Sequence, residues 1–404
     1  MTAQDSSFSN QPISDIGYSE RIPIWKLLAF TLAGFIAIMT ETMPAGLLPQ
    51  IGSSLGVSEA FAGQLVTLYA LGSVLAAIPI VAATRSWRRR PLFLLAILGL
   101  LVFNSITALS SNFVVILVSR FIAGMAAGLI WGLLAGYARR MVPNHLQGRA
   151  LAIVGVGQPI ALSIGVPLGT WLGGLSDWRG VFWIMSGLSF ALLIWVRSCI
   201  PDYPGQSSSK RQSIREIFLT PGIRSVLFVI FAWILAHNIL YTYIAPYLAS
   251  VGLAEYVDVV LFLFGASSVL GIWITGVFVD RSLRMLTILS LALFAAAALI
   301  IGFANGSSMV TLAGIALWGL TFGGAPTLLQ TAIADNAGEG TDVAQSMLVT
   351  VFNLAVAGGG LLGGVLLQYA GPGSFPWTLL VLAVLSLLAV LSARRHGFQP
   401  GRRS

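Results

Sequence analysis

Three ionisable side chains lie within long apolar stretches of the sequence, where a charge is costly. Glu41, Arg120 and His237 each have an apolar run on both sides. Even on the insertion scales that give the lowest penalties, a charge at the centre of a bilayer costs about 2.5–3.5 kcal/mol, so such residues usually serve a function. A carboxyl and an imidazole can bind and release protons, and a guanidinium can modulate them. The three residues therefore predict a proton-binding site inside a membrane.

Glu41 is the predicted proton site. Burial in lipid favours the protonated carboxyl, whereas a nearby Arg120 favours the ionised form. Competition between these effects would let the carboxyl change its charge as water reaches it from either side. The alternative is that Glu41 and Arg120 form a permanent structural ion pair. His237 either titrates as well or, beside Asn238, hydrogen-bonds a neighbouring helix.

No set of residues for enzymatic chemistry accompanies this group. The histidines are His145, His237 and His396, and neither an HExxH nor a GxSxG motif occurs. An enzyme would need a nucleophile with a base, or metal ligands. The single cysteine, Cys199, excludes an internal disulfide and provides no zinc pattern. We therefore expect no enzymatic activity, no metal and no cofactor.

The elements that hold these residues must lie in lipid. Of the 404 residues, 57% are hydrophobic and 9% are charged, with a mean hydropathy of +0.89, whereas soluble domains carry about 25% charged residues. Backbone groups in lipid must be satisfied within their own segment, so the apolar runs are expected to be helices. At about 20 residues per span, the sequence predicts an all-α membrane protein with twelve transmembrane helices near residues 25–51, 58–82, 91–109, 112–139, 149–175, 179–199, 224–249, 256–279, 285–304, 308–333, 343–369 and 375–393.

The positions of the lysines and arginines predict the orientation. Of the 22, Arg120 lies inside a span and Arg179 follows span 5, which leaves 20 in the tails or in loops after even-numbered spans. Because positive residues favour the cytoplasmic side, we expect both termini in the cytoplasm of a bacterial-type inner (plasma) membrane. The basic residues fall between apolar runs, so the net charge of +8 does not indicate binding of nucleic acid.

A segment rich in proline, serine and charge, residues 200–223, divides the chain almost in half. It is predicted to be a cytoplasmic linker with a short surface helix, IREIF. The predicted organisation is a cytoplasmic N-terminal tail, a six-helix bundle, this linker, a second six-helix bundle and a cytoplasmic C-terminal tail, at residues 1–24, 25–199, 200–223, 224–393 and 394–404.

The two halves repeat each other. A shift of 196 residues brings LGVS (55–58) onto VGLA (251–254) and TRSWR (84–88) onto DRSLR (280–284), and it brings Glu41 onto His237. Six spans duplicated in parallel are typical of carriers whose halves move around a site near the middle of the membrane. Glu41 and His237 are therefore expected to face each other between the halves.

Several segments resemble the major facilitator superfamily. GVFVDRSLR (276–284) is similar to its loop signature, a glycine, three residues, then Asp-Arg and further basic residues, whereas the counterpart ATRSWRRR (83–90) has Thr84 where Asp is usual. Three further segments resemble the drug:proton antiporter and arabinose-type sugar efflux branch, namely TETMPAGLLPQI (40–51), LYTYIAPYL (240–248) and WGLTFGGAPTLLQT (318–331). The resemblance covers residues 25–393 and implies the major facilitator fold, a monomer, and a central cavity lined by spans 1, 4, 7 and 10.

Aromatic and polar side chains on the faces toward such a cavity are candidate substrate contacts. Trp131 follows Arg120 by three helical turns and therefore shares its face. The complete set of predicted contacts is Trp131, Asn238, Tyr241, Trp318, Phe322 and Gln330. Aromatic side chains with few fixed charges suit neutral or weakly polar molecules rather than phosphates.

The fifth span carries GVPLGTWLGG (165–174), which is similar to the glycine motif of the family's antiporters, with Pro167 displaced and Thr170 where Pro is usual. Gly165, Gly169 and Gly173 leave one bare helix face for the close approach of a neighbour, and Pro167 predicts a bend. In the resembled antiporters this span lies at the interface of the halves. Plain helix packing is the alternative.

Two basic loops are candidate latches. Asp280, Arg281 and Arg284 are predicted to gate the second half. The arginines at 85–90 either latch the cytoplasmic ends of helices or only orient the chain. Thr84 in place of Asp weakens the latch interpretation there.

The predicted function is proton-coupled efflux, by antiport and alternating access, of small organic molecules such as drugs, sugars or nucleosides. The glycine pattern of span 5 favours efflux, but uptake by symport uses the same fold and the same proton site and stays the alternative. The repeat favours a carrier over a channel. The expected partners are the substrate, protons and the lipid bilayer.

Overall fold

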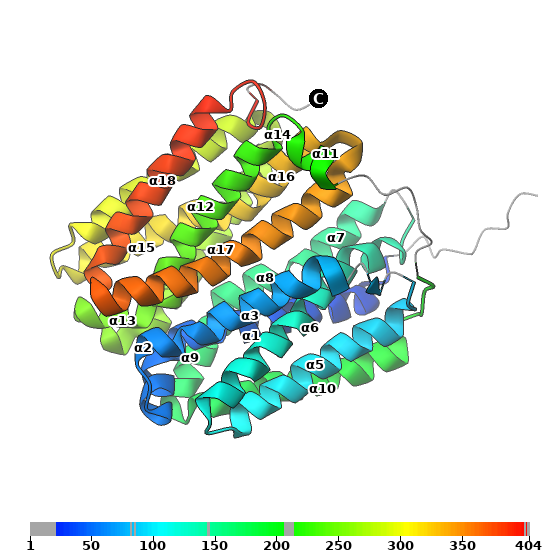
Figure 1. The fold of residues 1–404 in the computed structure, drawn as a ribbon, viewed down its shortest axis with the longest axis horizontal. Helices are drawn as coiled ribbons and strands as arrows, with labels where there is room; N and C mark the ends of the chain where they lie inside the picture. Colours follow the sequence, from blue (N-terminus) through cyan, green and yellow to red (C-terminus); the bar gives the residue numbers. More distant parts are fainter. Residues whose placement is uncertain are drawn as a thin grey trace, which may run out of the picture.

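The computed structural model describes residues 22–80, 83–84, 86–143, 146–205, 214–399 and 401. Helices from the first half of the sequence form one group and helices from the second half form another, seen in the lower and upper parts of Figure 1. The first group consists of α1 (Ile24–Leu55), α2 (Glu59–Ala62), α3 (Gln64–Leu75), a π-helical segment (Ala76–Ile80), α5 (Arg89–Leu109), α6 (Phe113–Arg139), α7 (Gln147–Gly155), α8 (Gly157–Ile160), a second π-helical segment (Ala161–Gly165), α9 (Val166–Leu175) and α10 (Trp178–Cys199).

The second group follows a short helix, α11 (Ile214–Leu219), which lies where the sequence predicts the surface helix. Its members are α12 (Ile223–Thr242), α13 (Ile244–Ser250), α14 (Val257–Gly302), α15 (Ser308–Gly323), α16 (Ala325–Ala337), α17 (Thr341–Tyr369) and α18 (Phe375–Ser392). Short 3-10 turns at 254–256, 338–340 and 372–374 connect several of them.

The helices agree with twelve spans. In the described part of the chain, ten helical stretches are long and apolar enough to cross a membrane. One of them, Ala254–Gly302, has 49 residues, about 74 Å at 1.5 Å per residue and more than twice the roughly 30 Å of a hydrocarbon core. It holds two spans, because Ser282 leaves the helical region with φ −159° and ψ 53°. The remaining span is α2 and α3 with the π-helical segment that extends them to Ile80. The predicted all-α fold is confirmed.

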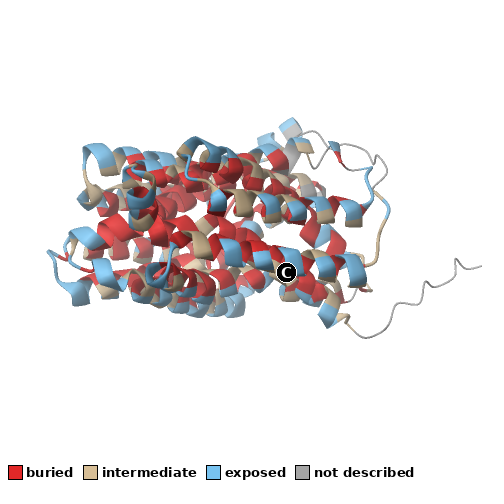
Figure 2. Cartoon of the chain, turned by 90° about the horizontal axis from the view of Figure 1, so that it is seen from below, coloured by how far each residue is buried: buried red, intermediate tan, exposed pale blue. Residues whose placement is uncertain are grey.

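The outer surface is apolar, as lipid requires. Figure 2 shows buried residues in the middle of the helices and exposed residues around them. Many of the exposed side chains are large and hydrophobic, for example Leu95, Val118, Phe262, Trp273 and Leu388. In water such a surface would promote aggregation, whereas in a bilayer it contacts the apolar acyl chains of the lipids.

The two groups of helices touch along two seams. α3 lies beside α17 (Figure 1), and α9 with its preceding π-helical segment lies beside α14. Glycine permits the second contact, because a Cβ atom at Gly265 would lie 2.4 Å from the Cα atom of Ser163. Small residues at such seams let two backbones approach closely and slide.

The start of the linker is anchored to the first group. The Asp202 carboxylate accepts hydrogen bonds from the Arg88 Nε atom, with which it also forms a salt bridge, and from the Arg90 backbone N–H at 3.0 Å. The Tyr137 hydroxyl donates to the Pro201 carbonyl at 2.6 Å. Although partial burial opposes ionisation, the hydrogen bonds from Arg88 and Arg90 lower the pKa of Asp202 below its ordinary value. Arg88 and Arg90 therefore hold the linker, whereas Arg85 and residues 206–213 lie outside the described residues.

Candidate functional site

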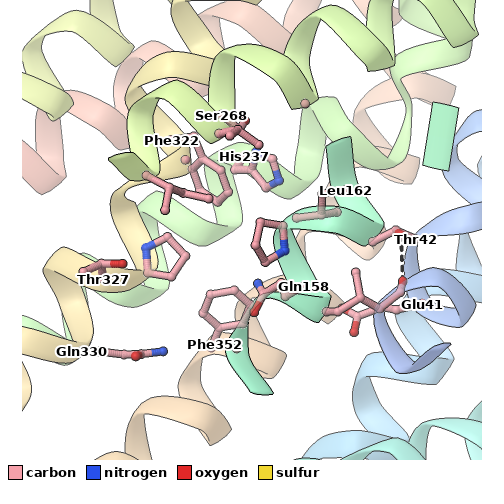
Figure 3. Close-up of a pocket in the computed structure, with 18 of the residues that line it drawn as sticks. Glu41, Thr42, Gln158, Leu162, His237, Ser268, Phe322, Thr327, Gln330 and Phe352 are labelled. Carbon is pink, nitrogen blue, oxygen red and sulfur yellow. Dashed lines mark hydrogen bonds between the residues drawn. The ribbon is translucent and has the colours of Figure 1, made fainter. Parts of the chain in front are cut away.

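A cavity of about 450 Å³ lies between the two groups of helices. Its walls come from α1, α6, α7 and α8 of the first half, and from α12, α14, α15, α16 and α17 of the second, with a few residues of the connecting turns. Figure 3 shows side chains from both halves pointing into the same space. Its size is typical of a site for small organic ligands.

Breaks in two helices shape the cavity wall. Between α7 and the π-helical segment, Gln158 and Pro159 occupy the single turn of α8 and line the cavity. Between α15 and α16 the chain turns at Gly323 and Gly324, and Pro326 follows in the first turn of α16. Because proline lacks an N–H and its ring clashes with the preceding turn, the helix is interrupted at both places, and residues of both breaks line the cavity.

Glu41 lies on α1 at the cavity wall and is 8% exposed. Among the described residues, no side chain or backbone group makes a hydrogen bond or an ion pair with its carboxyl group. The positive charge of Arg120 nevertheless lies close enough to act on that carboxyl. The carboxyl is thus available to a proton or a ligand in the cavity.

Arg120 lies behind the cavity wall, 0% exposed, and its side chain is bound to backbone carbonyls. Its Nη2 atom donates to the carbonyls of Thr40 and Glu41, and its Nε atom donates to the carbonyl of Leu65 at 3.3 Å. Its guanidinium carbon also lies 4.7 Å from the ring centroid of Tyr69. The alternative of a Glu41–Arg120 ion pair is therefore wrong for this conformation, because Arg120 reaches the main chain of α1 instead.

His237 lines the cavity from α12, on the opposite half from Glu41. Its ring stacks on Phe322 with centroids 3.5 Å apart, and Tyr241, Phe264 and Trp318 surround it with centroids at 5.1, 5.6 and 5.3 Å. Its Nδ1 atom is buried and has no hydrogen-bond partner in the described part of the molecule. The alternative reading, in which His237 hydrogen-bonds a neighbouring helix, is thus not what this conformation shows.

The predicted substrate contacts divide into two sets. Trp131, Asn238, Tyr241, Phe322 and Gln330 line the cavity. Trp318 is 1% exposed and does not line it, because its ring packs behind Phe264 with the two centroids 4.4 Å apart.

Sequence reasoning missed several cavity residues, of which Gln158 and Phe352 are the most prominent in Figure 3. Thr42, Ser268 and Thr327 also line the cavity. A search of the apolar spans for uncharged polar side chains would have found Gln158 and the hydroxyl residues. Nothing in the local pattern distinguishes Phe352 from a ring that faces lipid.

Hydrogen bonds join the two halves on one side of the cavity. They lie near Gly360 of α17, one helical turn after Val356, which lines the cavity. The Tyr243 hydroxyl donates to the Gly360 carbonyl of its own half at 2.7 Å, or across the halves to the Ala60 carbonyl of α2 at 3.3 Å. The Gln64 amide of α3 donates to the Gly360 carbonyl at 3.3 Å and to the Tyr243 oxygen at 3.3 Å. These contacts close the space between the halves on the side away from α11.

The three glycines of span 5 face α1 of their own half. A Cβ atom at Gly165 would lie 2.4 Å from the Met39 sulfur. The equivalent positions at Gly169 and Gly173 meet Met43 and Leu47. The glycines therefore seat three side chains spaced one turn apart, whereas Gly265 makes the close approach between the halves. Pro167 is buried at the start of α9, directly after a π-helical segment, where a bend is expected.

The predicted gating residues of the second half lie at the junction within α14. Asp280 and Arg281 are exposed. Arg284 donates to the carbonyls of Val390 and Phe398 at 2.7 and 2.8 Å. Arg284 thus anchors the end of α18 and the C-terminal segment of its own half. In the described part of the chain, no group of three or more His, Cys, Asp or Glu side chains is arranged to hold a metal ion.

Comparisons with known proteins agree with this architecture. A family model described as Major Facilitator Superfamily matches residues 30–347. The purine ribonucleoside efflux pump NepI of Shigella sonnei is 29% identical over 381 residues, which cover 92% of this chain and 96% of that protein. The probable sugar efflux transporter of Helicobacter pylori is 25% identical over 372 residues, which cover 91% and 95%. The crystal structure of the human organic anion transporter MFSD10 (TETRAN) matches with a TM-score of 0.68 at 17% identity, and it covers 92% of this chain and 100% of that chain.

Proposed function

This chain belongs to the Major Facilitator Superfamily and is a multi-pass membrane transporter rather than an enzyme, and from this premise we propose that it exports small uncharged organic molecules in exchange for protons. The observation that carries the proposal is the position of Glu41. Its carboxyl group lies at the wall of the cavity between the halves, without a counter-ion or a hydrogen-bond donor in the described structure. A carboxyl in this position can hold a proton when the cavity is dry and release it when water enters.

The exchange follows from competition at one site. Desolvation favours the neutral carboxyl, and the charge of the nearby Arg120 favours the ionised one. Bound substrate would then favour one state of the carrier, and protonation of Glu41 would favour the other. Binding of substrate and binding of a proton would therefore alternate. A ligand can shift a two-state equilibrium only by its different affinities for the two states. The substrate and the proton must therefore each bind with different affinity when the cavity is open to one side or to the other.

The two states differ at the seams between the halves. In the present conformation, the hydrogen bonds of Tyr243 and Gln64 hold α2, α3 and α17 together. We infer that this side faces the cell exterior, because the basic residues lie at the other ends of the helices and favour the cytoplasm. The substrate would then enter from the cytoplasm and leave once these hydrogen bonds open.

The relatives suggest the chemical range of the substrate. One is named a purine ribonucleoside efflux pump and another a probable sugar efflux transporter. Both kinds of molecule are uncharged, and aromatic rings with few fixed charges suit such molecules.

Everted membrane vesicles test the direction and the coupling together. Vesicles that contain the full-length protein should accumulate a labelled nucleoside or sugar when their interior is made acidic, and should release it when a protonophore removes the pH gradient. Vesicles with an empty vector serve as the control. Accumulation by right-side-out vesicles instead would indicate symport, and accumulation that ignores the protonophore would exclude proton coupling.

A further inference from the structure

Three polar side chains of the cavity wall are already hydrogen-bonded to carbonyls of their own helices. Thr42 donates to Ile38, Asn238 to Ile234 and Ser268 to Phe264, at 2.7–2.9 Å. In contrast, the side-chain carboxamides of Gln158 and Gln330 make no hydrogen bond to any described residue, although both line the cavity. A carboxamide has two donor hydrogens and an acceptor oxygen, and these need partners once a ligand displaces water.

The two free carboxamides come from different halves of the molecule. Gln158 lies in the single turn of α8, and Gln330 lies on α16. Figure 3 shows both side chains directed into the space beside Phe352. A ligand that occupies this space would therefore be bound from both halves at once.

Two aromatic rings are also without a ring partner. Trp131 of α6 and Phe352 of α17 line the cavity and are half-buried. Neither ring stacks on another ring of the described chain, whereas His237, Tyr241, Phe264 and Phe322 pack on one another. Aromatic rings bind planar partners by offset or edge-to-face contact, worth about 0.5–1.5 kcal/mol beyond the area that is buried.

We propose that the cavity is specific for uncharged, planar heteroaromatic compounds with a donor next to an acceptor on the ring edge, such as purine nucleosides, and that Gln158 recognises that edge. A planar carboxamide matches such an edge with two parallel hydrogen bonds, as Asn and Gln do with adenine. The free ring of Phe352 beside Gln158 supplies a surface for the base. A sugar alone has no aromatic ring and lacks the adjacent donor and acceptor of a base edge, so it would not form the two parallel hydrogen bonds with Gln158.

This inference rests on the proposed use of the cavity for substrate. The test is calorimetric titration of the purified full-length protein in lipid nanodiscs with adenosine, inosine and guanosine, and with ribose as the matched compound that lacks the base. We expect at least one nucleoside to bind at least tenfold more tightly than ribose. Gln158→Ala and Gln330→Ala should each weaken nucleoside binding about tenfold and leave ribose unchanged.

The matched control is Gln368→Ala, because Gln368 is an exposed glutamine of α17 outside the cavity. It should bind nucleosides as the wild type does. The proposal is overturned if no nucleoside binds, if ribose binds as tightly, or if Gln158→Ala binds nucleosides as the wild type does. The vesicle assay tests the proposed function independently. If nucleosides bind in a manner that depends on Gln158 but do not accumulate in response to a pH gradient, the proposed specificity stands and proton antiport is refuted.

Discussion

The Nη2 atom of Arg120 donates a hydrogen bond to the carbonyl oxygen of Thr40, the carbonyl that Pro44 leaves without its helical donor. In an α-helix the carbonyl of residue 40 accepts from the N–H of residue 44, and proline has none. Arg120 therefore replaces the main-chain donor that α1 lacks at Pro44. Its positive charge stays beside Glu41 without pairing with the carboxyl.

Replacing Arg120 should cost stability through this carbonyl. Arg120→Met leaves a buried acceptor unsatisfied, at a cost of about 1–3 kcal/mol, seen as an earlier thermal unfolding transition in detergent. Pro44→Ala restores an N–H at position 44, so the same replacement should cost less in that background. Equal losses in both backgrounds would show that the Thr40 carbonyl is not the reason.

Glu41→Gln should abolish accumulation of substrate driven by a pH gradient. An amide cannot take up and release the proton, so the coupling is lost, whereas exchange of labelled for unlabelled substrate needs no net proton movement and should persist. Glu255→Gln, at an exposed position in the turn before α14, is the control and should behave as the wild type. Normal pH-driven accumulation by Glu41→Gln would assign the proton to another residue.

Tyr243→Phe should open the seam between α2 and α17 more often. The change removes a hydroxyl whose contacts across the seam are the Ala60 carbonyl and the Gln64 amide, and the loss of about 1 kcal/mol corresponds to about a fivefold shift in population. A single cysteine placed at Thr327, in a Cys199→Ser background, should react faster with an impermeant maleimide added outside.

Tyr247→Phe is the matched control for this change, because the Tyr247 hydroxyl donates to the Ile301 carbonyl within the second half. It removes a hydroxyl without touching the seam, and labelling should stay at the wild-type rate. If both variants label at the same rate, the seam is held by packing rather than by Tyr243.

Gly265→Ala should disturb the other seam. Its new Cβ atom would meet the backbone of Ser163 at 2.4 Å, so the π-helical segment and α14 must separate, and transport should fall severalfold. Gly276→Ala lies on the same helix with open space around the new atom and should be tolerated. Impaired transport by both variants would point to helix flexibility instead of the contact with Ser163.

The anchor of the linker should weaken in acid. The lowered pKa of Asp202 means that the folded state favours the carboxylate; its contribution to stability is complete above the pKa of the unfolded chain and is lost as the pH falls through the folded-state pKa. Asp202→Asn should therefore lower the free energy of unfolding at neutral pH by no more than about 1 kcal/mol, because Arg88 is exposed, and this is measured as a slightly lower unfolding temperature. The difference from the wild type should vanish in acid and shrink in high salt.

Local patterns in the sequence were enough to predict the class of protein, the helices and several residues of the cavity. Lipid penalises charge and unpaired backbone groups over whole segments, so long apolar runs predict spans, and rare ionisable residues such as Glu41 and His237 indicate the cavity. These signals are local and do not depend on how the helices pack.

The partners of individual side chains, in contrast, depend on how the helices pack together. Arg120 and Trp131 share a helix face, yet one reaches a carbonyl freed by a proline in α1 and the other lines the cavity. Gln158 and Gln330 are far apart in sequence and face one space. The physical reason is that a helix face is predictable from its period, whereas the neighbour that covers this face is set by close packing among many helices.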